Sequence, residues 1–243
     1  MMEEMLYKAC KKLRFGINII DNAKIIKKDN NIEFLLELFT LELENRDMKR
    51  KNAYIKQAKF DVLKTFEDYS FEDIKIPKSI TPDDIVNTTF VKKKENLILY
   101  GNVGSGKTHL AIATGIAACN SGKKVRFYRT AALVNELVEA KKQGNIVRYM
   151  KNIEKCDLLI CDEWGYVPVD TNGAKLLFGV IADCYERKSL IITTNLEFVK
   201  WNEVFYDEKL TAAIIDRIIH HSHLLDFSER DSRRLQNSLI KLK

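Results

Sequence analysis

The chain has 243 residues, of which 46% are hydrophobic and 30% are charged, a composition typical of a globular protein with one large domain and room for a small second one. No apolar run approaches the roughly 20 residues that a membrane helix requires, and basic residues interrupt the segment where a signal peptide would need an apolar core. The formal net charge of +6 permits a nucleic acid partner without requiring one, and the five cysteines form no C-x-x-C pair. We therefore expect a cytoplasmic protein with reduced thiols and no membrane partner.

Residues 1–65 form a predicted helical N-terminal region with a polar composition. Neither proline nor glycine occurs between residues 17 and 76, so long helices can form here. Asn31 is predicted to cap one of them. The apolar positions of that helix follow the 3.6-residue period: Phe34, Leu35, Leu38 and Phe39.

The end of this region is basic, since residues 44–64 carry seven basic and three acidic side chains. Two interpretations stay open. The stretch is a solvated helical face, or it is a basic helix that contacts the phosphates of double-stranded DNA. Residues 66–96, with the aromatic run FEDYSF and two prolines, are predicted to be a linker at the start of the second domain, residues 66–243.

From residue 97 onward, short apolar runs alternate with helical patterns, which predicts an α/β fold with a parallel sheet flanked by helices. The predicted strands are residues 97–100, 125–128, 158–161 and 190–194. The predicted helices between them are residues 107–119, 131–142 and 172–187.

The segment GNVGSGKT, residues 101–108, lies between the first predicted strand and an alanine-rich helix. Strand, glycine loop and helix in this order are typical of a phosphate-binding loop of the G-x-x-x-x-G-K-[ST] type. Lys107 is then predicted to reach the β- and γ-phosphates of ATP, and Thr108 to bind Mg²⁺. The candidate nucleotide-binding residues are Gly101, Asn102, Val103, Gly104, Ser105, Gly106, Lys107, Thr108 and His109.

Two later strands end in polar residues suited to hydrolysis. The strand DLLIC is followed by Asp162 and Glu163, and we expect the first to hold the Mg²⁺ hydration shell and the second to orient or deprotonate the attacking water. The strand LIITT is followed by Asn195, whose amide can hold that water beside the γ-phosphate. A strand that simply reaches solvent also ends in polar residues, but the order of the strands favours catalysis.

Several cationic residues near the C-terminal end need an interpretation. Arg217 lies in the helical stretch AAIIDRIIHH. It is either a solvated side chain, as an isolated arginine usually is, or an arginine finger that acts on a neighbouring subunit of an oligomeric ATPase. Arg233 and Arg234 offer a further phosphate-sensing arginine. We expect no metal at His220, His221 and His223, because no closed ligand set is visible and the cluster continues an amphipathic helical segment.

Taken together, these motifs resemble the IstB-like family of AAA+ ATPases, which are helper proteins of insertion-sequence transposition related to the DnaC and DnaI helicase loaders. The resemblance runs from about residue 33 to residue 235. The phosphate loop resembles G-x-x-G-T-G-K-T-H-L-A, and DLLICDEWGYVPVD resembles D-L-L-I-x-D-E-L-G-Y-x-P. The more specific elements are NLEFVKW, which resembles N-x-x-F-x-x-W, and DRIIHHSH, which resembles D-R-L-x-H-H-x-H.

The resemblance implies a role for each matching residue. Lys107, Thr108, Asp162 and Glu163 would bind nucleotide and Mg²⁺ and hydrolyse ATP, and Asn195 would be the sensor 1 residue. Arg217 would be the finger in trans, and Arg234 the sensor 2 residue, although Arg233 competes with it because tyrosine is usual at that position. Trp164 replaces the usual leucine after the acidic pair.

The resemblance also implies an ATP-dependent homo-oligomer on double-stranded DNA and a transposase partner. A loader of a replicative helicase is the alternative function, because both proteins use the same ATP chemistry. A monomeric small-molecule phosphotransferase is a third hypothesis; it would need a substrate lid that the sequence does not reveal.

Overall fold

The structure is a computed structural model that describes residues 1–67, 69–166, 170–205, 207–230 and 232. Arg233 and Arg234 therefore lie outside the described residues. The chain divides into two compact units, Met1–Ala53 and Tyr54–Lys243. The predicted functional division after residue 65 stays a prediction. No described helix is both long and apolar enough to cross a membrane.

The N-terminal part is helical, as predicted. It contains α1 (Met2–Lys12), α2 (Ile19–Ile25) and the long α3 (Asn31–Ala58), which continues into the second unit. The predicted cap is wrong by one residue, because the Asn30 side chain accepts a hydrogen bond from the backbone N–H of Ile32 at 2.8 Å. Asn31 already belongs to the helix, and Asn30 satisfies a donor that the first turn leaves without a helical partner.

A parallel sheet with strand order β2-β3-β4-β1-β5 forms the centre of the second unit in the described part of the chain. Its strands are β1 (Asn96–Tyr100), β2 (Val125–Arg129), β3 (Leu158–Trp164), β4 (Ser189–Thr194) and β5 (Ser222–Asp226). The central strands are nearly continuous apolar runs because helices cover both faces. The α/β prediction is confirmed.

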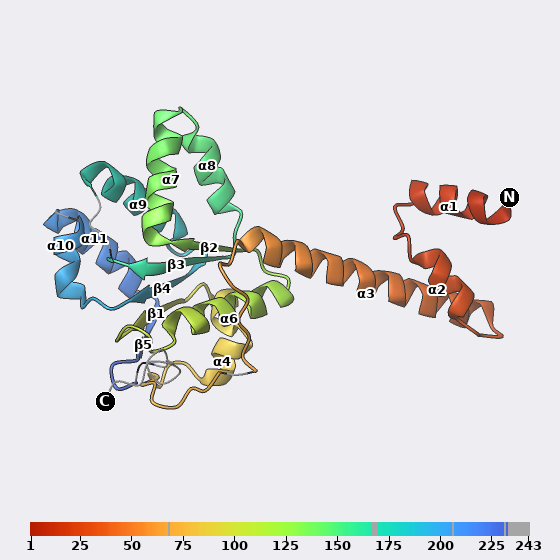
Figure 1. The fold of residues 1–243 in the computed structure, drawn as a ribbon, viewed down its shortest axis with the longest axis horizontal. Coiled ribbons are helices and arrows are strands. Elements are labelled where there is room, and N and C mark those ends of the chain that lie inside the picture. Colours follow the sequence, from red (N-terminus) through yellow and green to blue (C-terminus); the bar gives the residue numbers. More distant parts are fainter. Residues whose placement is uncertain (68, 167–169, 206, 231, 233–243) are drawn as a thin grey trace, which may run out of the picture. The chain divides into compact units, whose positions relative to one another are not determined.

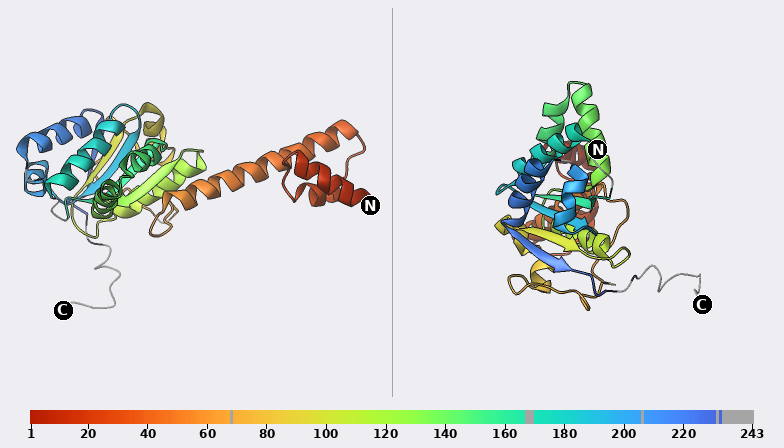
Figure 2. Two further views of the ribbon diagram at one scale, coloured as in Figure 1. Left: turned by 90° about the horizontal axis from the view of Figure 1, so that it is seen from above. Right: turned by 90° about the vertical axis from the view of Figure 1, so that its left-hand side faces the viewer.

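Helices pack on both faces of this sheet, with α7, α8 and α9 above it and α6 and α4 below it in Figure 1, and Figure 2 gives two further views. The residues of β3 alternate between the two cores: Leu159 and Cys161 pack with α7 and α9, whereas Leu158 and Ile160 pack with α6. The helices of this unit are α4 (Pro82–Val86), α5 (Thr89–Lys93), α6 (Lys107–Asn120), α7 (Thr130–Lys142), α8 (Ile146–Glu154), α9 (Thr171–Cys184), η1 (Phe198–Lys200), α10 (Trp201–Phe205) and α11 (Glu208–Ile219).

The four predicted strands are confirmed, each one to three residues longer than expected. The helix predicted over residues 172–187 ends at Cys184, because Tyr185 has a non-helical ψ of 125° and Glu186 has a φ of +55°. The segment after α11 does not continue the helix, since Ser222 begins β5. The helix α8 was not predicted.

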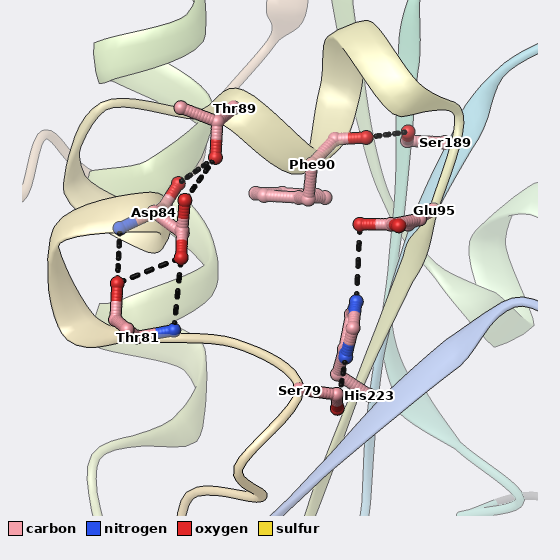
Figure 3. Close-up of polar contacts among 8 residues, drawn as sticks. All are labelled: Ser79, Thr81, Asp84, Thr89, Phe90, Glu95, Ser189 and His223. Carbon is pink, nitrogen blue, oxygen red and sulfur yellow. Dashed lines mark hydrogen bonds and ion pairs between the residues drawn. The ribbon is translucent and has the colours of Figure 1, made fainter.

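The segment before β1 is anchored by polar contacts, which Figure 3 shows. Thr81 and Asp84 form a reciprocal capping box at the start of α4, and hydrogen bonds from Thr89 and Thr81 lower the pKa of Asp84 to about 2. Further along, Lys75 exchanges two backbone hydrogen bonds with Asp226 of β5, at 2.9 and 3.1 Å. This segment therefore covers the end of β5 at one edge of the sheet.

All five cysteines are free thiols, and four of them are buried. Burial raises the pKa of Cys156 to about 11 and those of Cys119 and Cys184 to about 12, and it also raises the pKa of Cys161. These groups are therefore protonated and act as small apolar core residues, as the sequence predicts.

Trp164, the residue that departs from the family pattern, is fully buried at the end of β3. Its ring centroid lies 5.4 Å from that of Trp201 and 5.6 Å from that of Phe205. We expect Trp164→Ala to lower the free energy of unfolding by about 3–5 kcal/mol, the usual loss for a large aromatic side chain in a core. Denaturant titration measures it, with the half-exposed Tyr166→Ala as control. Equal losses of unfolding free energy in both variants would show that the buried Trp164 contributes no more to stability than the half-exposed Tyr166.

Candidate functional site

The glycine loop crosses the carboxyl end of the sheet between β1 and α6, and positive φ angles together with close contacts explain two of its glycines. Gly101 has a φ of +140°, and a Cβ atom there would lie 2.6 Å from the backbone of Phe227. Gly104 has a φ of +81°, and a Cβ atom would lie 2.3 Å from the Ser232 hydroxyl oxygen. Any larger residue would be strained and would clash with the segment after β5.

Polar side chains of the loop hold its shape. The buried Ser105 hydroxyl donates to the carbonyl oxygen of Asn102 at 2.7 Å, and the Asn102 amide donates to the carbonyl oxygen of Ser228 at 2.9 Å. The Lys107 ammonium donates to the carbonyl oxygens of Gly101 and Asn102 at 2.7 and 2.6 Å. The ammonium therefore lies inside the loop that the sequence predicts to bind phosphate.

The two acidic residues lie at an irregularity between β3 and β4. Cys161 pairs with Ile192 and Trp164 with Thr194, so that Asp162 and Glu163 together oppose a single residue, Thr193. Glu163 has a φ of +58°, a conformation that is uncommon for residues other than glycine. Such a bulge changes where side chains point: Asp162 is buried, whereas Glu163 is exposed.

The Asp162 carboxylate is the centre of a small hydrogen-bond network. The Thr108 hydroxyl at the start of α6 donates to it at 2.9 Å, and the Thr193 hydroxyl of β4 donates at 2.5 Å. Thr193 also accepts the backbone N–H of Glu163 at 2.9 Å, which ties the acidic pair together. A hydroxyl and a carboxylate at this distance form an oxygen donor set of the kind that Mg²⁺ prefers, so the residues present fit this ion.

One pocket brings together predicted site residues from three separate segments. It is lined by Val103, Gly104, Lys107, Thr108, Glu163, Tyr166, Thr193, Thr194 and Asn195. The phosphate loop, the acidic residue after β3 and the amide after β4 therefore meet at one end of the sheet, although they are far apart in sequence. The sequence analysis did not identify Thr193, because nothing in the local sequence distinguishes it from the neighbouring Thr194.

The aromatic run FEDYSF, which the sequence singled out, places Tyr69 beside the loop, whereas its partner Arg230 was not predicted. Tyr69 lies with its ring centroid 5.0 Å from that of His109, the last of the predicted nucleotide-binding residues. Arg230, which is 5% exposed, donates to the Tyr69 hydroxyl at 3.1 Å and to the carbonyl oxygen of Ser70 at 2.8 Å. A Cβ atom on Gly106 would lie within 4 Å of both side chains, so this cluster borders the phosphate loop.

Arg217 does not line this pocket. It lies on α11, donates to the carbonyl oxygen of Ala213 at 3.0 Å and stacks over the ring of Phe178 at 4.9 Å. The same helix lines an open, mostly apolar groove with residues of η1 and α10. The other predicted cation, Arg234, and its competitor Arg233 lie outside the described residues.

Comparison with known proteins agrees with this arrangement. The model of the family described as "IstB-like ATP binding protein" matches residues 22–240. An insertion sequence IS232 putative ATP-binding protein of Bacillus thuringiensis is 36% identical over 194 residues, which cover 79% of this chain and 76% of the relative. An insertion sequence IS21 putative ATP-binding protein of Pseudomonas aeruginosa is 34% identical and covers 85% of this chain and 78% of the relative.

Solved structures with a similar fold include replication proteins. A DnaC helicase loader superposes with a TM-score of 0.52 at 22% identity over 67% of this chain and 95% of that one. DnaI superposes with a TM-score of 0.55 at 17% identity over 70% and 90%. These identities establish the fold alone, an AAA+ parallel sheet flanked by helices. By its sequence the chain belongs to the IstB-like ATP-binding family, whose relatives here are ATP-binding proteins of insertion sequences.

Proposed function

We propose that this chain is a Mg²⁺-dependent ATPase that assembles on double-stranded DNA and regulates a transposase during insertion-sequence transposition. The hydrogen bond between Thr108 and Asp162 is the main observation in favour of ATP hydrolysis, because it joins the phosphate loop to the acidic end of β3. Glu163 and Asn195 line the same pocket. This is the set of groups that ATP hydrolysis requires.

Each residue has a defined part in this proposal. The backbone N–H groups of the loop and Lys107 bind the phosphates, and an incoming phosphate competes with the loop carbonyls for the ammonium. Thr108 and Asp162 hold Mg²⁺, which neutralises phosphate charge. Glu163 accepts a proton from the attacking water, and Asn195 orients that water. The strained backbone of Glu163 supports a functional role, since such conformations concentrate at active sites.

The adenine base of ATP is proposed to lie against the aromatic cluster of Tyr69. The ring borders both Gly106 and His109, so a base can stack here while the phosphates occupy the loop. Arg230 fixes the tyrosine through its hydrogen bond. This pairing supplies a base contact that the sequence alone did not identify.

Lys107→Ala is expected to weaken nucleotide binding, because the change removes the charge that faces the β- and γ-phosphates. Equilibrium titration with a fluorescent ATP analogue measures this loss. Lys123→Ala, on the turn after α6, is the matched control and should bind normally. An unchanged dissociation constant for Lys107→Ala would contradict the assignment of the phosphate loop.

The choice of a transposase partner follows the relatives, whose names place them in insertion sequences. The DnaC and DnaI structures support only the shared fold, so loading of a replicative helicase stays the second candidate. A pull-down of the full chain with ATP and DNA, offered both a transposase from the same element and the host helicase, separates the two. Selective capture of the helicase would reject the transposition assignment.

DNA binding is proposed to involve the basic stretch of α3. Asp47 forms ion pairs with Arg50 and Lys51, but these pairs lie on the surface, where a DNA phosphate can replace the carboxylate. Changing Lys49, Arg50 and Lys51 to alanine should weaken DNA binding and flatten its salt dependence by up to about 0.9 per lost phosphate contact. Fluorescence anisotropy at several salt concentrations measures the slope. Equal slopes in both proteins would mark the stretch as a solvated face.

Assembly into a homo-oligomer completes the proposal. Arg217 lies outside the pocket of its own chain, and the apolar groove on the same helix offers surface for a neighbouring subunit. ATP and DNA are both available in the bacterial cytoplasm, where we propose that the protein acts. Arg217 is proposed to act in trans on the nucleotide pocket of that neighbour.

A further inference from the structure

The three histidines that are close in sequence do not stay together in the structure. His223 enters β5, where it is 8% exposed and contacts Ser79 at 2.8 Å and Glu95 at 3.1 Å, as Figure 3 shows. His220 and His221 remain at the surface in the turn between α11 and β5. From the sequence we expected no metal at the three histidines, which we considered as one group. The fold separates His223 from the other two and brings a different side chain to them.

Glu186 takes the place of His223. This residue lies in the turn after α9, and its carboxylate comes within reach of both surface histidines, so that one ligand atom from each of the three residues lies within 4.8 Å of the others. The Nε2 atom of His221 and the Oε1 atom of Glu186 are 3.7 Å apart. This distance is too long for a hydrogen bond, but two ligands of one metal ion are separated by a comparable distance.

Tyr185 orders the histidine rings. Its hydroxyl lies 3.0 Å from Nδ1 of His220, which leaves Nε2 of that ring for a metal ion. Its ring centroid lies 6.0 Å from that of His220 and 6.1 Å from that of His221. Metal-binding histidines typically use their second nitrogen in a hydrogen bond of this kind, because the bond fixes the ring orientation.

We propose that Glu186, His220 and His221 bind one Zn²⁺ ion, with water completing its coordination. Two imidazoles and one carboxylate form a ligand set that zinc accepts, and the open position suits an exposed site. His220 follows directly after the last turn of α11, where the helix dipole favours a cation, and Asp216 adds a negative charge one turn earlier.

The bound ion joins the end of α9 to the end of α11. These two helices already pack together, and the cation–π contact between Phe178 and Arg217 is a second link between them. Zinc at this position therefore restricts the helix that carries Arg217. The site is separate from the nucleotide pocket, so zinc binding does not depend on the proposed ATPase activity.

Isothermal titration of the metal-free full chain with Zn²⁺, without nucleotide, tests the proposal. One Zn²⁺ per chain is expected. His220→Gln, His221→Gln and Glu186→Gln should each weaken binding by more than the roughly 10- to 100-fold loss expected for Tyr185→Phe, which removes only the orienting hydroxyl. Glu154→Gln makes the same chemical change at an exposed glutamate of α8 and should leave binding unchanged.

Titration with Co²⁺ adds a spectroscopic readout that does not depend on stability. Co²⁺ bound by a few nitrogen and oxygen ligands absorbs visible light. This absorption should appear in the wild type and be absent in the three ligand variants. Circular dichroism without metal should be alike in all proteins, because the three ligand side chains are exposed and Tyr185→Phe removes only a hydroxyl group. Absence of saturable zinc binding, or equal binding in wild type and ligand variants, would overturn the proposal; the latter would assign the ion to another site such as Cys10.

Discussion

Replacing Arg217 with alanine should leave ATP binding nearly intact and slow ATP hydrolysis by about 10³- to 10⁵-fold, the range of an arginine finger. The positive charge stabilises the phosphoryl group during transfer, so its loss acts on the rate and not on affinity. In this chain the guanidinium stacks over Phe178 and does not line the nucleotide pocket. The proposal therefore assigns it to the pocket of a neighbouring subunit.

Mixing experiments separate action in trans from action within one chain. Arg217→Ala mixed with Glu163→Gln should recover part of the activity, because some interfaces then combine an intact glutamate with an intact arginine. Wild-type ATPase activity should also rise faster than linearly with protein concentration, and DNA should increase it by gathering subunits. Arg148→Ala, an exposed arginine on α8, is the matched control.

The loss of the stacking contact with Phe178 is a separate effect of Arg217→Ala. A cation–π contact contributes about 0.5–1 kcal/mol at an exposed site, so thermal unfolding of the variant must be measured beside its activity. A mixture that never recovers activity, together with a wild-type rate per subunit that is independent of concentration, would rule out the finger in trans. The monomeric phosphotransferase hypothesis would then gain support.

Glu163→Gln should keep ATP binding and lower hydrolysis by about 10²- to 10⁴-fold, the usual contribution of a general base. The amide has the size of the carboxylate but cannot accept the proton of the attacking water. The bulge between β3 and β4 exposes this side chain at the pocket and leaves Asp162 buried beneath it. A single-turnover assay with radiolabelled ATP measures the chemical step directly.

Glu197→Gln is the matched control, since it removes an exposed carboxylate from the segment that follows β4. It should hydrolyse ATP at the wild-type rate. Wild-type turnover in Glu163→Gln would assign the base to another residue. Loss of ATP binding in that variant would instead indicate that the carboxylate shapes the pocket.

The sequence predicted the structure best where a local pattern of residues directly reflects burial. Runs such as Leu97–Tyr100 are apolar on both faces, so they predict strands of a parallel sheet without knowledge of their partners. The loop from Gly101 to Thr108 is a contiguous motif that continues directly into the next helix, so it can be recognised without knowledge of distant contacts. The order of the motifs along the chain also led us to expect that this loop would meet Glu163 and Asn195, whereas the order of the strands within the sheet was not predicted.

Contacts between distant segments were not predictable in this way. Among the strands in the described part of the chain, Ser222–Asp226 was missed, because its residues alternate between buried and more exposed positions and it follows a helix after a turn of two residues. Arg230 and Tyr69 are 161 residues apart, and although Tyr69 lies in the aromatic run FEDYSF, Arg230 belongs to no motif. Glu186 reaches His220 and His221 only because α9 ends at Cys184, two residues before it, instead of continuing to residue 187.

The backbone bridge between Lys75 and Asp226 has a consequence for aggregation. Open edges of a sheet present unpaired N–H and C=O groups that recruit strands from other molecules. At β5 the bridge occupies two of these groups, and at the opposite edge Arg126 and Arg129 of β2 are held by Gln57 and Asp61. These contacts therefore disfavour uncontrolled strand addition at both edges of the sheet.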